Sequence, residues 1–201
     1  MKNKGFTLIE LAIVLIIIGL ILGMIFKGKN LIENAKVKHL ATQYNKVIAA
    51  VNAFYDRYGF YPGDGCTTPT PTDISTDCSA TKNGVIDTTT EYLAFWHLLI
   101  NVHGFLKASD RKTVFGFPLH LIHETNRGKT ATWLYFLGNE NPPYPPVSVP
   151  IKYICALDQM IDDGEATTGD IVFKTTDPYS PNTDCWILDG NSDEVRLYLL
   201  P

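Results

Sequence analysis

The sequence lacks the short motifs that mark many enzymes. It contains no Gly-x-Ser-x-Gly elbow and no Gly-x-Gly-x-x-Gly loop. The segment His120 to Glu124 has the residue types of a zinc protease in the wrong order, which favours a polar strand edge or loop as the place of its histidines. Gly128-Lys129-Thr130 lacks the first glycine of a phosphate-binding loop, because His123 stands there. We therefore expect no enzymatic activity and no required cofactor.

Cysteine and positive charge are also scarce. The four cysteines are spaced too widely for Cys-x-x-Cys zinc or redox motifs. The formal net charge of −4 gives the chain no general electrostatic reason to bind nucleic acid or anionic lipid. The length of 201 residues, less one apolar segment, suits one compact domain.

The run from Phe6 to Phe26 is almost free of charge, and its one acid is Glu10. As a helix this run is about 31 Å long, close to the thickness of the hydrocarbon core of a bilayer. A buried carboxylate costs about 3 kcal/mol, which the many large apolar side chains outweigh. The run is therefore expected to insert into a membrane as a helix.

The residues around the start of this run resemble a known processing signal. Lys4-Gly5-Phe6-Thr7-Leu8-Ile9-Glu10 is similar to the class III signal of type IV prepilins and type II secretion pseudopilins. The resemblance implies that a prepilin peptidase cuts after Gly5 and that Phe6 is methylated. It also implies that Glu10 pairs with the amino-terminal charge of Phe6 in a neighbouring subunit. An acid in an apolar membrane helix is expected to face such a partner. The alternative is an ordinary single-span anchor with Glu10 near the lipid headgroups.

No proline occurs before Pro62, so the apolar run can continue directly into a second helical segment. Apolar residues at steps of three and four form one stripe there: Val37, Leu40, Tyr44, Val47, Val51, Phe54 and Tyr58. We predict that this stripe packs on the chain's own globular domain. The chain is therefore expected to have four segments: a leader (1–5), a membrane and assembly helix (6–27), an amphipathic stalk helix (28–58) and a globular domain (59–201).

The globular domain is expected to combine short helices with strands. Tyr58 to Asp64 ends the stalk, and residues 65–90 are expected to form a long exposed loop. Helices are predicted for 91–102, capped by Thr89 or Thr90, and for 153–161; the prolines from Pro142 to Pro150 mark a stiff connection. Strands are predicted for 131–137, 170–174, 185–188 and 194–200, with a hairpin turn between the last two. The fold class is α+β, with the long helix on a small antiparallel sheet, as the family resemblance also implies.

Three disulfide connectivities are open to four cysteines. We choose the sequence-local pairing, Cys66 with Cys78 and Cys155 with Cys185, and a carboxy-terminal disulfide loop is also what the resemblance to pilins implies. Reduced, buried thiols are the alternative, which an exported protein disfavours.

Two groups of acids are candidate calcium ligands. The first is Asp158, Asp162, Asp163 and Asp170, and the second is Asp189, Asn191 and Asp193. Ca²⁺ needs six to eight oxygens, and neither group alone supplies a full set. The alternative is that these residues bond to backbone amides in turns. The resemblance adds that some pseudopilins bind calcium in a carboxy-terminal loop.

The leading functional hypothesis is a subunit of a type IV pilus-like filament or of a type II secretion pseudopilus. Its expected partners are other pilin or pseudopilin subunits, the prepilin peptidase and an inner-membrane assembly platform. The chain would lie in the bacterial inner membrane before assembly and in a periplasmic or extracellular filament afterwards. The alternative is a minor tip subunit for adhesion or DNA uptake, the one setting in which a nucleic acid ligand is expected. The long Thr/Pro-rich loop and Lys27, where many major pilins have proline, support this alternative.

Overall fold

The computed structural model describes residues 7–136, 149–173, 179–192 and 195–201, and the chain divides after Lys36 into two compact units. Helix α1 (Leu8–Tyr58) forms the first unit from Leu8 onward and continues into the second, Val37–Pro201. This confirms one continuous helix across the apolar run and the stalk. It ends where Gly59 adopts a φ of 78°, a left-handed conformation that glycine takes without steric cost.

In the second unit the predicted stripe of α1 is buried. Val37, Leu40, Tyr44, Val47, Val51 and Phe54 are at most 7% exposed, and Tyr58 packs at the margin of the same core. The Tyr44 hydroxyl also donates to the Tyr198 carbonyl oxygen at 2.6 Å, which ties the helix to the sheet. The stripe therefore packs on the chain's own domain, as its spacing predicts.

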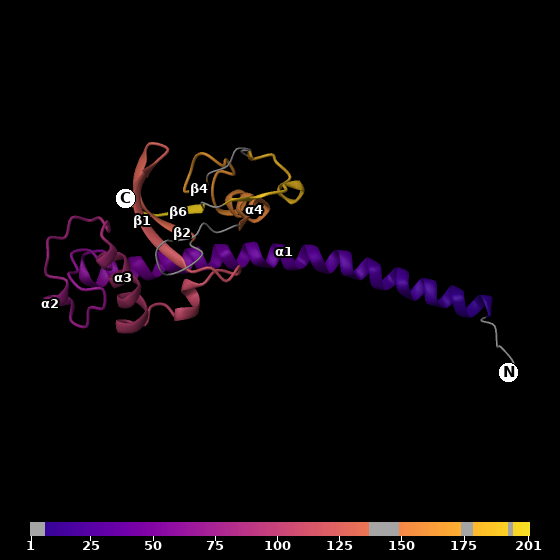
Figure 1. Cartoon of the computed structure of the whole chain (residues 1–201), viewed down its shortest axis with the longest axis horizontal. Coiled ribbons are helices and arrows are strands. Elements are labelled where there is room, and N and C mark those ends of the chain that lie inside the picture. Colours follow the sequence, from indigo (N-terminus) through magenta and orange to yellow (C-terminus); the bar gives the residue numbers. More distant parts are fainter. Residues whose placement is uncertain (1–6, 137–148, 174–178, 193–194) are drawn as a thin grey trace. The chain divides into compact units, whose positions relative to one another are not determined.

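The sheet beside this part of α1 has four antiparallel strands in the order β1-β2-β6-β4 (Figure 1). Their bounds are β1 (Leu119–Asn126), β2 (Lys129–Phe136), β4 (Ile171–Phe173) and β6 (Val195–Leu200). A second, two-stranded sheet pairs β3 (Val149–Pro150) with β5 (Asn191–Ser192). The remaining elements are α2 (Ile74–Asp77), α3 (Thr89–His97), the π-helix η1 (Leu98–Val102), α4 (Ile151–Ile161), and the 3₁₀ helices η2 (Ala108–Arg111) and η3 (Cys185–Ile187). The α+β fold, a long helix on a small antiparallel sheet, is confirmed.

Several local predictions are confirmed. Strands β2, β4 and β6 and helix α4 lie where the sequence places them, within two residues at each described end. The two histidines of the 120–124 segment lie on β1, an edge strand of the sheet. The prolines from Pro142 to Pro146 fall outside the described residues.

The predicted strand at 185–188 is wrong, and with it the hairpin to β6. Cys185–Ile187 is a 3₁₀ helix because Asp184 caps it by accepting from the Trp186 N–H at 3.1 Å, while Cys185 is bonded to Cys155 of α4. The hairpin in the described chain is β1–β2, whose two-residue turn is Arg127-Gly128.

Two buried carboxylates organise the segment between α1 and α3. Asp64 accepts from the backbone N–H groups of Asn83 and Gly84. Glu91 accepts four bonds of 3.0 to 3.1 Å, from the N–H groups of Gly65, Asp87 and Thr88 and from the Thr88 hydroxyl. The cap of α3 is thus Thr88, one residue before the predicted candidates, because Glu91 completes a capping box with it.

The segment predicted as a long exposed loop is only partly so. It contains the short helix α2, and Cys66, Pro71, Cys78 and Ile86 are buried within it. The bonds from Gly65 to Glu91 and from Asn83 and Gly84 to Asp64 hold this segment against its neighbours, and none of these long-range contacts is visible in its composition. The Cys66–Cys78 disulfide closes the segment on itself.

Candidate functional site

The first unit presents an apolar surface along α1. From Leu8 to Ile32, the described large apolar side chains are between 47% and 87% exposed. By length and composition this helix could cross a membrane. An isolated surface of this size is unfavourable in water, so lipid or other apolar helices are expected to cover it.

Glu10 lies in the first turn of this helix. Its carboxylate oxygen Oε2 accepts from both the N–H and the hydroxyl of Thr7, each at 2.8 Å, and the Glu10 N–H donates back to the Thr7 hydroxyl at 3.3 Å. This is a capping box, which satisfies donors that the start of a helix otherwise leaves unpaired. The Thr-x-x-Glu spacing of this box is present in the sequence, and the predicted assembly role of Glu10 does not include it. Gly5 and Phe6, the predicted processing residues, fall outside the described residues.

Both predicted disulfides are present. Cys66 is bonded to Cys78 and Cys155 to Cys185. The first closes the loop that contains α2, and the second joins α4 to η3. All four cysteines are buried, so each disulfide is part of the core.

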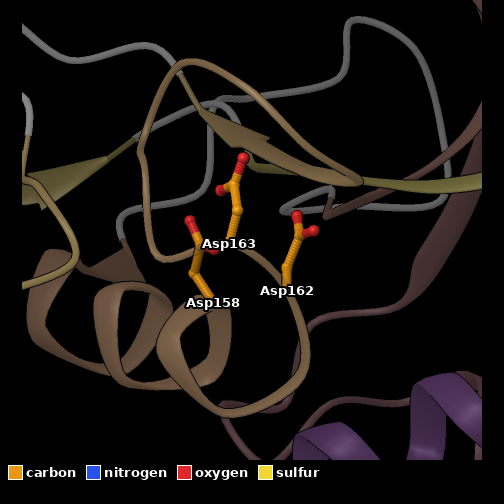
Figure 2. Close-up of side chains that lie close together, drawn as sticks. All are labelled: Asp158, Asp162 and Asp163. Atoms are coloured by element: carbon orange, nitrogen blue, oxygen red, sulfur yellow. The ribbon is translucent and has the colours of Figure 1, made fainter.

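The structure brings together three of the predicted acids. Asp158, Asp162 and Asp163 lie at and just after the end of α4, and each offers a carboxylate oxygen within 4.8 Å of the others (Figure 2). Among the described residues, Asp170 and Asp189 do not join this group. Asp170 instead pairs with the Lys129 ammonium at 2.8 Å. Asn191 lies in β5 opposite Pro150, and Asp193 falls outside the described residues.

Each of the three carboxylates already accepts hydrogen bonds from other groups of the folded chain. Asp158 accepts from the Gly164 N–H at 2.7 Å and from the Tyr179 hydroxyl at 2.6 Å. Asp162 and Asp163 accept from the backbone N–H groups of residues 170, 171 and 165 and from the Thr168 hydroxyl. These bonds are the role that the turn interpretation predicts, and a bound cation would have to share the same oxygens.

Asp158 is fully buried. Burial raises its pKa to about 6, the donors Tyr179 and Gly164 oppose the rise, and the charges of Asp162 and Asp163 add to it. Its charged form is therefore costly in the folded chain. The hydrogen bond from Tyr179 links α4 to a residue 21 positions further along the chain, and no local sequence motif predicts it.

Comparison with known proteins gives one match at the amino terminus. Residues 1–26 match the family model of the prokaryotic N-terminal methylation motif. The chain is also similar to the major type IV pilin PilA1 from Clostridium difficile, with 15% identity over 85% of this chain and 98% of that chain and a TM-score of 0.43. No curated protein sequence matches it. The amino terminus therefore carries the prepilin-type methylation motif, as its resemblance to type IV prepilins and type II secretion pseudopilins predicts.

Proposed function

We propose that this chain is a structural subunit of a type IV pilus-like filament or of a type II secretion pseudopilus. One observation carries the proposal: the match to the methylation motif, residues 1–26, overlaps the start of a 51-residue helix that begins at Leu8. The described large apolar side chains of this helix are exposed from Leu8 to Ile32. The methylation motif and the exposed apolar surface of α1 thus share the same part of the chain.

The exposed apolar surface has two environments that can cover it. Before assembly, the lipid of the bacterial inner membrane would do so, with the chain held by a single span. After assembly, the same side chains would contact the helices of neighbouring subunits. Lipid tails and packed helices are similarly apolar, so the transfer costs comparatively little hydrophobic free energy. A prepilin peptidase and an inner-membrane assembly platform would be the partners of these two steps.

Glu10 has one role within the single chain and a second role in the assembled filament. Within one chain it caps α1 through Oε2, and no described residue donates to its Oε1. A carboxylate has room for more than two bonds. Cleavage after Gly5 would create a positive amine at Phe6, and Oε1 would then pair with that amine in a neighbouring subunit.

The test separates the charge of Glu10 from its cap. Glu10→Gln retains an acceptor for Thr7 but loses the negative charge, whereas Thr7→Ala removes the cap partner and leaves the charge. Cleavage is followed by the mass of the mature chain, and incorporation by the amount of subunit in sheared filaments. We expect Glu10→Gln to be cleaved normally and its incorporation to fall at least about tenfold, as expected for a lost charge pair in an apolar environment. Thr7→Ala should be incorporated nearly as well as the unaltered chain. Normal incorporation of Glu10→Gln would refute the assembly role of its charge.

This role involves no catalytic residue and requires no cofactor. Calcium binding by Asp158, Asp162 and Asp163 is a separate proposal, supported by their closeness at the end of α4.

A further inference from the structure

The segment between α2 and α3 contains the one Asn-Gly pair of the sequence, Asn83-Gly84. Gly84 has a φ of 79°, in the left-handed region, so any other residue at this position would be strained. Asn83 is exposed, and its Oδ1 accepts from the Val85 N–H at 2.9 Å. The turn therefore requires a residue without a side chain directly after an exposed asparagine.

An asparagine in this setting is open to attack by the next backbone nitrogen. The Gly84 nitrogen would form a bond to the side-chain carbon Cγ of Asn83, and the bond from Cγ to the amide nitrogen would break. Ammonia leaves with the proton of the Gly84 N–H, and a succinimide ring remains. Water then opens the ring at either carbonyl carbon, which gives aspartate or isoaspartate. Glycine hinders this attack least, because it has no Cβ.

A buried carboxylate opposes this reaction in the folded chain. Asp64 is 1% exposed, and its Oδ2 accepts from the Gly84 N–H at 3.0 Å while its Oδ1 accepts from the Asn83 N–H at 3.2 Å. To attack, the Gly84 nitrogen must give up its proton and with it the hydrogen bond to Asp64. The negative charge that develops on this nitrogen would also lie close to a carboxylate, which is unfavourable where water is largely excluded. The reaction therefore requires the contact with Asp64 to open first.

Conversion of Asn83 would weaken the contact that delays it. The succinimide nitrogen carries no hydrogen for Asp64, isoaspartate lengthens the backbone by one carbon, and both final products add a negative charge near the buried carboxylate. We propose that Asn83 is a slow deamidation site, that Asp64 limits its rate by holding the Gly84 N–H, and that conversion loosens the segment between α1 and α3. This proposal goes beyond the filament role and does not depend on it.

The reaction is followed in the full-length chain in detergent micelles, kept for several weeks at mildly alkaline pH. Protease digestion and mass spectrometry measure the fraction of each peptide that has gained the mass difference between an amide and an acid. Asn101, which is also exposed but precedes the branched Val102, is the reference within the same chain. We expect Asn83 to convert while Asn101 stays intact, and to convert about tenfold or more faster in urea, where the bond to the charged Asp64 is lost. An intact Asn83 would overturn the site, and equal rates with and without urea would overturn its protection by the fold.

Two substitutions separate the contact with Asp64 from a general loss of stability. Asp64→Ala removes both acceptors and should speed conversion of Asn83 about tenfold without urea. Glu91→Ala is the matched control, because it loosens the same segment but leaves the bonds from Asn83 and Gly84 to Asp64 in place, so it should speed conversion less. Equal acceleration in the two variants would refute a specific role of Asp64. Slower conversion in Asp64→Ala would also refute it, since Asp64 would then act as a base.

Two further measurements complete the test. If circular dichroism shows that Asp64→Ala is unfolded, Asp64→Asn decides, because it keeps one acceptor oxygen but loses the charge. A rate in folded Asp64→Asn no higher than in the unaltered chain would refute the proposal. The converted chain, separated from the intact chain by its added charge, should melt at a lower temperature. An equal melting temperature would overturn the loosening of the segment.

Discussion

Replacing Glu91 tests whether one carboxylate holds the segment between α1 and α3. Glu91 is 8% exposed and accepts four bonds, three of them from backbone N–H groups. A hydrogen bond to a charged group contributes about 1.5 to 3 kcal/mol, and bonds that share one acceptor do not add fully. We expect Glu91→Ala to lower the free energy of unfolding by about 3 kcal/mol. At about 2 to 4 °C per kcal/mol for a domain of this size, the melting temperature should fall by about 6 to 12 °C.

Glu91→Gln should cost less, about 1 to 2 kcal/mol. Its amide oxygen can serve Asp87 and Thr88, but its NH₂ group would then face the N–H of Gly65, the donor to Oε1 in the unaltered chain. The matched control is Asp87→Asn, which removes the same charge from an exposed side chain in the same turn. The assay is thermal unfolding of the full-length chain in detergent, followed by circular dichroism with the disulfides intact.

The pH dependence supplies a second readout of the same carboxylate. Burial raises the pKa of Glu91, but the N–H groups of Gly65, Asp87 and Thr88 outweigh it, so its pKa lies below the ordinary value of 4.5. A lowered pKa means that the folded chain binds the proton less tightly than the unfolded chain. The stability from Glu91 is therefore present above pH 4.5 and is lost as the pH falls through its lower, folded value. The loss of unfolding free energy caused by Glu91→Gln should become smaller as the pH falls over that range. A penalty of Glu91→Ala no larger than that of Asp87→Asn would refute the argument.

Three further predictions follow from single positions. Gly63→Ala should destabilise the chain far more than Gly59→Ala. Both glycines have a positive φ, but only a Cβ at Gly63 would lie 2.5 Å from the Glu91 carbonyl oxygen. Equal melting temperatures of the two variants would contradict this prediction. Burial raises the pKa of Asp158 to about 6, so the folded chain binds this proton more tightly, and stability should fall as the pH rises from about 4 through 6. In Asp158→Asn this fall in stability should be absent. Urea unfolding at several pH values across this range measures it, and an equal fall in the variant would contradict the prediction. Calcium should release heat on titration and raise the melting temperature at pH 7, less so in Asp158→Asn; no heat and no shift would rule out the calcium site.

The sequence determined the parts of the fold that depend on long, regular patterns. An uninterrupted apolar run and a stripe at steps of three and four predicted α1 over nearly its whole length, because a helix repeats its environment every turn. The residues around Gly5, Phe6 and Glu10 predicted the methylation motif, because such a motif is a short linear segment of sequence. The disulfide pairing followed from sequence-local choice and is confirmed.

The tertiary structure decided the features that depend on distant partners. Cys185–Ile187 looked like a strand because a short apolar run has no period of its own, and its cap and its bond to α4 made it a 3₁₀ helix. Only the fold brought Glu91 to the N–H of Gly65 and Tyr179 to the buried carboxylate of Asp158. Likewise, only the pairing of β1 with β2 placed Arg127 in a turn beside the Thr167–Gly169 loop. Such contacts join groups that the chain separates by many residues, so no local pattern records them.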